Sequence, residues 1–385
     1  MLRKRFTIEG SGSYKRTSDS SSGFTPNWLN ISFVVPMHLI GLLAWPTYLY
    51  LSHGDIRWPE IAAFVFMFIL GSIGVDVGYH RAFTHRAFHM SPFMRLLGLF
   101  GAASVGEGSA LTWCSDHRRH HRFQDTDQDP YNVRRGFWWA HMGWILGSPT
   151  SSDFTNCPDL LKDKLVINQH KYYPIWLVLS CFLLPLGIGF LLGRPLQVFL
   201  FAGFTRLFLI NHFTYLINSY AHYFGRRPYS SGITARDSLV CAILAQGEGW
   251  HNYHHRFPYD YRNGHRFYHY DPTKWFIFVA QFLGLTSNLK RTPAHEIYRA
   301  RIQTKRQWIS APKTPHFAKL EEALDVSLAQ WQEWHNELAR IRFQMGEKGS
   351  KRIQTLKANA NRARHEFKIL YAEWKQWLKG MAAPV

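Results

Sequence analysis

Four long apolar stretches constrain the fold of this chain most strongly. They cover residues 31–51, 61–79, 172–192 and 196–217, and each is close to the roughly 20 residues that a helix needs to cross the hydrocarbon core of a bilayer. Backbone groups in that layer must find their hydrogen-bond partners within the segment, so the stretches predict membrane-spanning helices. Short linkers join them into two hairpins. We therefore expect an all-α integral membrane protein with four transmembrane helices.

The distribution of basic residues predicts the orientation of these spans. The two linkers within the hairpins carry one arginine each, Arg57 and Arg194, whereas the N-terminal segment and the regions after the second and fourth spans are rich in Lys and Arg. By the positive-inside rule, both termini face the cytoplasm. The chain has a net charge of +19, and its basic residues are interspersed with acids and tryptophans beside apolar segments. This pattern indicates binding to a lipid surface and not to nucleic acid.

Histidines are concentrated in four short motifs: HRAFTH at 80–85, HRRHH at 117–121, NSYAH ending at 222 and HNYHH at 251–255. Neutral imidazole is a common ligand of transition metals. In the two H-x-x-H-H motifs, spacings of three and four place each trio on one helical face, and we expect each trio to reach a common centre. His80 and His85 are five apart, so they need a distorted turn or a helix end to converge. Nine such ligands exceed what one ion accepts, which implies two metals.

The position of the motifs favours chemistry at the membrane surface. All four follow the second or the fourth span, so the ligands gather at the cytoplasmic mouth of the bundle, outside the hydrocarbon. A metal transporter would place its ligands inside the spans, although a non-enzymatic metal-binding or transport protein remains an alternative. Histidine suits iron, zinc, copper and nickel alike, and a role in activating oxygen would select iron.

Further motifs make the chain similar to a known family. With the histidine motifs, DPYNVRRGFWWAHMGW at 129–144, GEGW before the last box and FPYDY at 257–261 resemble the membrane-bound fatty acid desaturases of the stearoyl-CoA delta-9 type, over residues 30–290. The resemblance implies four transmembrane helices under a cytosolic helical cap that holds a di-iron site. It also implies an enzyme that uses O2 to insert a cis double bond, at delta-9, into a saturated acyl-CoA or acyl-lipid chain. A related di-iron lipid hydroxylase would use the same histidines.

Carried over position by position, the resemblance assigns the site residues. The implied ligands of the two iron ions are His80, His85, His117, His120, His121, His222, His251, His254 and His255. Asn218 matches an asparagine that reaches one iron through water. We expect Glu248 and Asp116 to accept imidazole N–H groups, while the resemblance gives Asp116 a second possible role at the substrate headgroup. Arg134 and Arg135 are expected either to hold phosphate or to lie at the lipid surface.

The chain departs from the animal acyl-CoA members at the headgroup. The animal members have an Arg immediately before the Asp that precedes the second histidine motif, where this chain has Ser115. They also have an Arg-Lys pair after the Gly-Trp that follows RRGF, where this chain has Ser148 and Pro149. Both acyl-CoA and acyl-lipid substrates therefore stay open. The sequence contains no HPGG haem motif, ferredoxin cysteine pattern or dinucleotide-binding glycine motif. We expect a separate electron donor of the ferredoxin, cytochrome b5 or flavin reductase type, and a bacterial inner membrane in preference to the endoplasmic reticulum.

Composition divides the chain into three parts. Residues 1–30 are rich in Ser, Gly, Lys and Arg and are expected to be disordered. Residues 31–290 form the membrane desaturase domain, in which Arg206 should point into the bundle. In residues 291–385, apolar residues recur at spacings of three and four on both sides of Gly346 and Gly349. This pattern predicts an antiparallel helical hairpin, either a structural appendage or a docking surface for a partner.

Overall fold

The computed structural model describes residues 24–147, 152–309, 314–345 and 351–381. Within it the chain forms two compact units. The membrane unit comprises residues up to 226 together with 233–291, and the tail unit comprises residues 227–232 and those from 292 onward. Gly346, Gly349 and most of the N-terminal segment lie outside the described residues.

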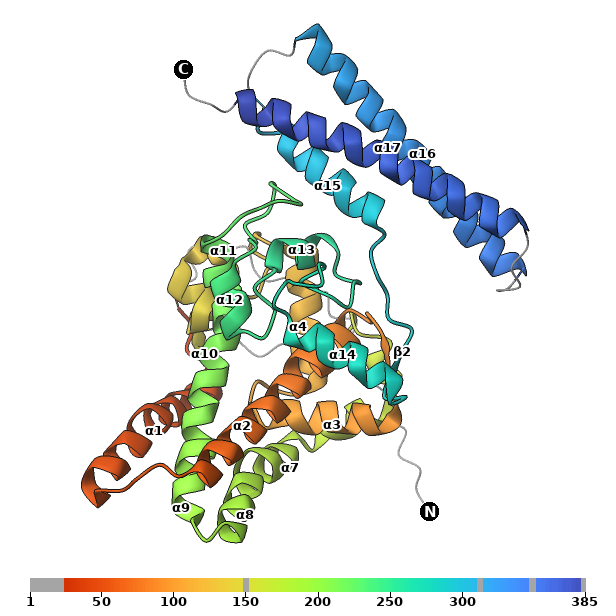
Figure 1. The fold of residues 1–385 in the computed structure, drawn as a ribbon. Helices are drawn as coiled ribbons and strands as arrows, with labels where there is room; N and C mark the ends of the chain where they lie inside the picture. Colours follow the sequence, from red (N-terminus) through yellow and green to blue (C-terminus); the bar gives the residue numbers. More distant parts are fainter. Residues whose placement is uncertain (1–23, 148–151, 310–313, 346–350, 382–385) are drawn as a thin grey trace. The chain divides into compact units, whose positions relative to one another are not determined.

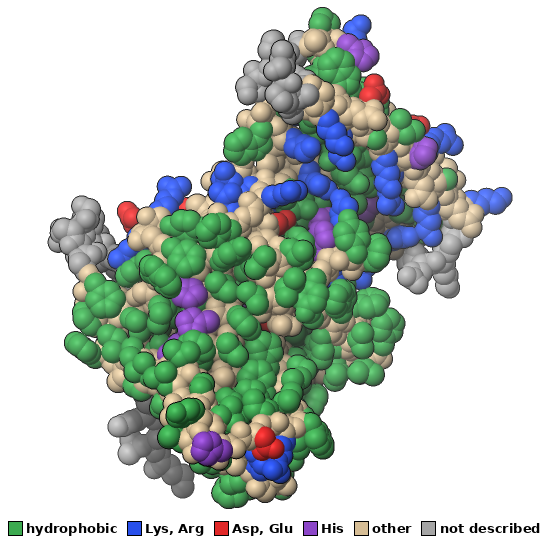
Figure 2. All heavy atoms as spheres, turned by 60° about the vertical axis from the view of Figure 1, so that its left-hand side comes forward, with side chains coloured by type: hydrophobic (Ala, Val, Ile, Leu, Met, Phe, Trp, Pro, Cys, Tyr) green, Lys and Arg blue, Asp and Glu red, His purple; other side chains and the backbone are tan. Residues whose placement is uncertain are grey.

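The membrane unit contains four helical runs that are long and apolar enough to cross a membrane, as the sequence predicts. They are Trp28–Ser52 (α1); Trp58–Thr84, made of α2 (Trp58–Ser72) and the π-helix η1 (Ile73–Thr84); Tyr173–Leu191, made of α7 (Tyr173–Leu177), η5 (Val178–Leu183) and α8 (Leu184–Leu191); and Pro195–Tyr223, made of α9 (Pro195–Val198), η6 (Phe199–Thr205), α10 (Arg206–Asn218) and α11 (Tyr220–Tyr223). The surface of these runs is dominated by hydrophobic side chains in Figure 2.

The second and fourth runs extend further than the apolar stretches that predict them. They continue to Thr84 and Tyr223, so His80 and His222 lie on the last turns of the runs and not in the loops beyond them. Arg206 points into the bundle as expected, where it is fully buried and donates to the carbonyl of Ser104 at 2.8 Å.

Shorter elements cover the ends of these runs. They are α3 (Pro92–Ala103), α4 (Ala110–Phe123), η2 (Val133–Arg135), η3 (Trp139–Gly143), α5 (Trp144–Gly147), η4 (Leu160–Lys162), α6 (Lys164–Lys171), α12 (Leu239–Leu244), α13 (His251–Arg256) and α14 (Pro272–Phe282). In Figure 1, α4, α12 and α13 are grouped at the ends of α2 and α10. Besides the helices, the described residues contain one two-stranded antiparallel ladder, between β1 (His89–Met90) and β2 (Thr286–Ser287).

Glycines let η1 pack directly against α3. A Cβ atom on Gly74 would lie 1.9 Å from the backbone nitrogen of Ala102, and one on Gly101 would lie 2.3 Å from the carbonyl oxygen of Leu70. Neither contact can be relieved by a side-chain rotation, because both involve backbone atoms. The widened η1 helix, which carries the first histidine motif, is thus held against α3 by backbone contact.

The tail unit contains α15 (Ala294–Arg306), α16 (Pro315–Met345) and α17 (Lys351–Met381). Figure 1 shows α16 and α17 as an antiparallel pair, which confirms the expected hairpin. The side chains buried between its helices include Phe317, Leu324, Trp331, Phe367 and Trp374. Helix α15 does not follow from the sequence pattern. Its residues Tyr298 and Ile302 join the side chains buried between α16 and α17, so the unit is a three-helix assembly.

Candidate metal centre

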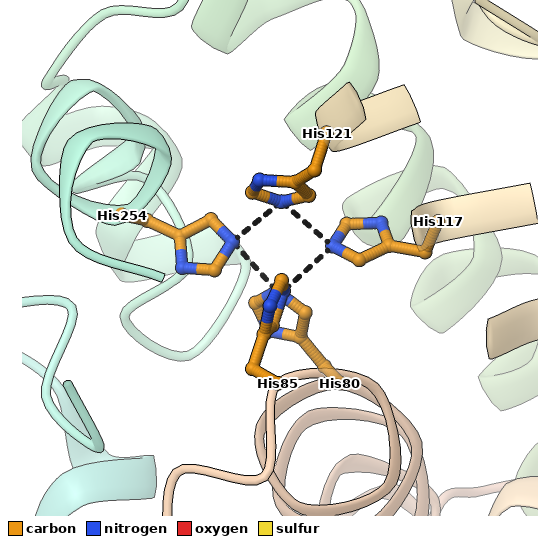
Figure 3. Close-up of side chains that lie close together, drawn as sticks. All are labelled: His80, His85, His117, His121 and His254. Carbon is orange, nitrogen blue, oxygen red and sulfur yellow. Dashed lines mark hydrogen bonds between the residues drawn. The ribbon is translucent and has the colours of Figure 1, made fainter. Parts of the chain in front are cut away.

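The nine predicted histidines form two groups of converging side chains. His80, His85, His117, His121 and His254 make up the five-histidine group, and His120, His222, His251 and His255 make up the four-histidine group. In each group, one nitrogen from every ring lies within 4.8 Å of the corresponding nitrogens of the others. Figure 3 shows the five-histidine group, whose rings point inward from three separate segments.

The π-helix brings the first motif together. A π-helix closes its hydrogen bonds between residues five apart, and the amide of His85 donates to the carbonyl of His80 at 3.2 Å. The two rings therefore meet with centroids 4.9 Å apart. This is the distorted turn that the spacing of five requires.

The two H-x-x-H-H motifs do not each serve one centre, so that expectation is wrong. On α4, His117 and His121 belong to the five-histidine group and His120 to the other. On α13 the division is reversed, because His254 joins the five-histidine group. Residues four apart differ by about 40° around a helix and residues three apart by about 60° in the opposite sense. The i+3 histidine therefore turns away from its neighbours toward the second group.

Acceptors on the far side of several rings fix their orientation. The Nδ1 atoms of His80 and His120 lie 2.8 Å from carboxylate oxygens of Glu248 and Asp129, respectively. Similarly, the Nδ1 atoms of His117 and His222 lie 2.9 Å from the Tyr131 hydroxyl and 2.7 Å from the Thr234 hydroxyl. Glu248 thus lies where an acceptor for an imidazole N–H group was expected. Asp129 was missed, although its place at the start of the DPYNVRR motif marked it as a candidate.

The Nε2 atoms within each group lie close together. The Nε2 atom of His254 lies 3.0 Å from those of both His80 and His121. In the four-histidine group the Nε2 atom of His251 lies 3.1 Å from those of His222 and His255. Two nitrogens bound about 2.1 Å from one ion at a right angle would be about 3.0 Å apart. The spacing therefore fits nitrogens that share a metal.

Burial keeps these rings neutral, as metal ligands must be. It lowers the pKa of His85, His117, His121, His251, His254 and His255 well below the usual range, and the repulsion that would arise between neighbouring protonated rings lowers it further. A neutral ring that donates from Nδ1 to a carboxylate has a lone pair on Nε2. The orientation of His80 and His120 therefore presents lone pairs to the two centres, and the residues fit a bound metal.

A buried ion-pair network holds Glu248 in place. Arg81, only 1% exposed, donates to Glu248 at 2.7 Å and to Asp271 at 2.9 Å. Burial opposes ionisation of Glu248, yet the charge of Arg81 and the hydrogen bonds from Arg81 and His80 hold its pKa below the usual range. Asn263 also donates to this carboxylate. Glu248 is therefore held as a carboxylate that accepts the N–H group of His80.

A cavity of about 190 Å³ adjoins the five-histidine group. Its lining combines apolar side chains such as Phe33, Val75 and Ile217 with His80 and His117. The space is thus suited to an alkyl chain that passes beside the five-histidine group.

One acid on the cavity wall was not singled out by the sequence analysis. Glu107 accepts a hydrogen bond from Nε1 of Trp113 at 3.1 Å. Burial raises the pKa of Glu107 to about 7, against the hydrogen bonds from Trp113 and Thr214. This carboxyl can therefore be neutral or charged near physiological pH.

The remaining predicted residues lie around the cavity and the surface. Asn218 and Asp116 both line the cavity. Asp116 accepts from Arg119 at 3.3 Å and makes no recorded bond to an imidazole, so Asp129 has the role first expected of it. Arg134 and Arg135 lie in η2, and the guanidinium of Arg135 is 3.3 Å from the ring centroid of Trp139. His141 and His212 bond to one another at 3.0 Å, outside both histidine groups.

A helical membrane bundle with two adjoining histidine groups beside an apolar cavity defines a membrane-bound metalloprotein of the multi-histidine class. The family model described as fatty acid desaturase matches residues 56–284. The chain belongs to this family.

Individual relatives agree with this family assignment. The chain is 39% identical over 295 residues to acyl-CoA desaturase 1 of Saccharomyces cerevisiae, covering 74% of this chain and 56% of the relative. It is 33% identical over 277 residues to delta(9)-fatty-acid desaturase fat-6 of Caenorhabditis elegans, covering 70% and 80%. For stearoyl-CoA desaturase 5 of Homo sapiens the identity is 36% over 248 residues, covering 61% and 74%. The chain thus spans little more than half the length of the yeast relative. All three organisms are eukaryotes, which does not support the expectation of a bacterial membrane.

Proposed function

We propose that this protein is an O2-dependent acyl-CoA desaturase that introduces a cis double bond at the delta-9 position of a saturated chain. The observation that carries the proposal is the pair of histidine groups, one of which lines a largely apolar cavity. Acid–base side chains cannot remove hydrogen from an unactivated methylene, because its acidity lies far outside any range to which a pKa can be tuned. The cavity and the metal-binding groups together suit this oxidation.

The substrate class is supported by the relatives, which are named for acyl-CoA and stearoyl-CoA. Ser115 occupies the position at which animal members have an arginine near the headgroup. In this chain its hydroxyl donates to the carbonyl of Asp153 and to Asn156, both at 2.9 Å. Ser115 therefore has a structural role, and cationic side chains at other positions have to bind the headgroup.

We assign iron to both groups, with the nine histidines as ligands and Asn218 as a ligand through water. Bound iron would supply the O2-dependent oxidation. The chain's own residues do the rest: Glu248 and Asp129 orient the rings of His80 and His120, and the buried cavity excludes water and aligns the chain for reaction. The electrons come from a separate donor protein, and the metal groups and both termini face the cytoplasm.

Expression in cells that lack their own desaturase, followed by fatty-acid analysis with double-bond location, tests this function. The unsubstituted protein should produce a cis-9 monounsaturated acid. His120→Ala and His254→Ala each remove one ligand from a different group and should abolish the product while the protein stays in the membrane, because the spans satisfy their own backbone. The neighbouring His269→Ala, outside both groups, serves as the control. A hydroxylated product, or full activity in either ligand variant, would contradict the proposal.

A further inference from the structure

The tail unit presents a continuous row of cations, which we call the basic stripe. On α17 it consists of five exposed side chains: Lys357, Arg364, Lys368, Lys375 and Lys379. At about 100° per residue, they fall within an arc of roughly 60° on the helix. Glu366 and Glu373, the acidic residues of α17, lie roughly 160° away by the same geometry. The other cations of α17, Lys351, Arg352 and Arg362, lie on the same side as these acids. The stripe is therefore a face of the helix that carries cations and no acids.

Helix α15 widens the stripe. Burial lowers the pKa of Lys305, and the positive charges of Lys375, Arg301 and Lys379 lower it further, which places these cations from two helices close together. The ammonium group of Lys305 lies 6.0 Å from the ring centroid of Trp374. Such contacts with aromatic faces favour cations at fixed positions without neutralising them.

Several acids of the tail unit form ion pairs with cations outside the stripe. Glu321 and Asp325 pair with Arg306, and Glu337 pairs with Arg340 and Arg352. No ion pair recorded between described residues involves a cation of the stripe. On the face of this unit visible in Figure 2, Lys and Arg greatly outnumber acidic side chains. Among the described residues the stripe therefore carries positive charge that no ion pair neutralises, and such a surface attracts a polyanion.

The surroundings of the stripe favour a protein over a lipid surface. Helices that bind in the membrane interface insert exposed apolar side chains next to their cations. The apolar face of α17 is buried in the hairpin instead, with Phe367 and Trp374 both fully covered. Ile369, the one large exposed apolar residue among those described on α17, lies about 110° from the centre of the stripe. The partner is therefore expected to offer carboxylates and not a bilayer.

We propose that the basic stripe docks an acidic one-electron carrier protein. The proposal rests on the function proposed above. In each turnover one O2, two electrons and two protons are consumed, two C–H bonds of the substrate break, and an alkene and two waters form. The carrier is oxidised by one electron at a time, so it must bind and leave twice. Charge pairing accelerates encounter while leaving the complex weak, which suits such repeated exchange.

The test compares two triple variants with equal loss of charge. Lys368→Gln, Lys375→Gln and Lys379→Gln neutralise the stripe, whereas Lys319→Gln, Lys351→Gln and Arg362→Gln neutralise exposed cations elsewhere on the tail. The full chain is placed in phosphatidylcholine nanodiscs and titrated with an acidic cytochrome b5 haem domain, following binding by calorimetry and turnover by product analysis. In the stripe variant, the Kd and the KM for the carrier should rise on the order of tenfold at low salt.

Three further readouts complete the test. The turnover driven by dithionite and the kcat at saturating carrier should match those of the unsubstituted protein, and the difference in KM should shrink at about 0.5 M salt. Equal Kd values for the stripe and control variants would overturn the proposal. So would a stripe effect seen only in phosphatidylserine nanodiscs, which would assign the stripe to lipid headgroups. Absence of dithionite-driven desaturation in the unsubstituted protein, with carrier binding intact, would instead contradict the proposed function.

Discussion

Replacing Glu248 by glutamine should weaken metal binding and the fold together. The carboxylate accepts from Arg81 on one oxygen and from His80 and Asn263 on the other. The amide of glutamine can accept at only one of these places, and its NH2 group then faces another donor. Breaking one side of a buried ion pair costs about 3–5 kcal/mol. Loss of an acceptor behind a ligand histidine lowers metal affinity about 10- to 100-fold.

Asp271→Asn separates these two effects. Asp271 also binds Arg81, at 2.9 Å, but contacts no ligand histidine. Both variants should lower the melting temperature of the detergent-solubilised protein, whereas only Glu248→Gln should show a large loss of metal affinity in chelator competition. Equal losses of metal affinity in the two variants would refute the assignment of Glu248 as the residue that positions His80.

Three further outcomes are expected. A neutral Glu107 is easier to cover with an alkyl chain than its carboxylate, so activity should fall as pH rises through about 7. Glu107→Gln should abolish this fall, and a variant with the same pH profile as the unsubstituted protein would contradict the reasoning. Gly74→Ala would place Cβ 1.9 Å from the backbone nitrogen of Ala102, so it should lower the melting temperature strongly, whereas Gly187→Ala, which meets nothing within 4 Å, should not. Tags at residues 5 and 380 should both be protected in right-side-out vesicles while a tag at Gly54 is accessible; termini on opposite sides would remove one span.

The spans and the hairpin were predictable because both depend on patterns along the chain. Membrane length fixes each span to within a few residues, and the seam from Phe317 to Trp374 follows helical periodicity. Helix α15 was not anticipated, because its buried residues Ile297, Ala300 and Ile302 alternate with charged side chains and form no single apolar face.

The composition of the metal groups was predictable, but their division was not. The motifs and the family resemblance identify the nine histidines, yet the choice between two centres depends on how α4 and α13 are rotated against each other. The same limit applies to Asp129, whose bond to His120 at 2.8 Å depends on the turn that follows α4. Tertiary packing decides both, and a spacing rule confined to one helix contains no information about its partner.

The exchange of histidines between α4 and α13 links the occupancy of the two metal groups. Each helix contributes two ligands to one group and one to the other, so the rotation that suits one ion also presets the ligands of the second. The binding free energy of the first ion would be reduced by the entropic cost of ordering both helices, whereas the second ion would bind to a site already formed. If each group takes one ion, as proposed, molecules with a single ion should be scarce at equilibrium, and the two ions should be gained and lost together.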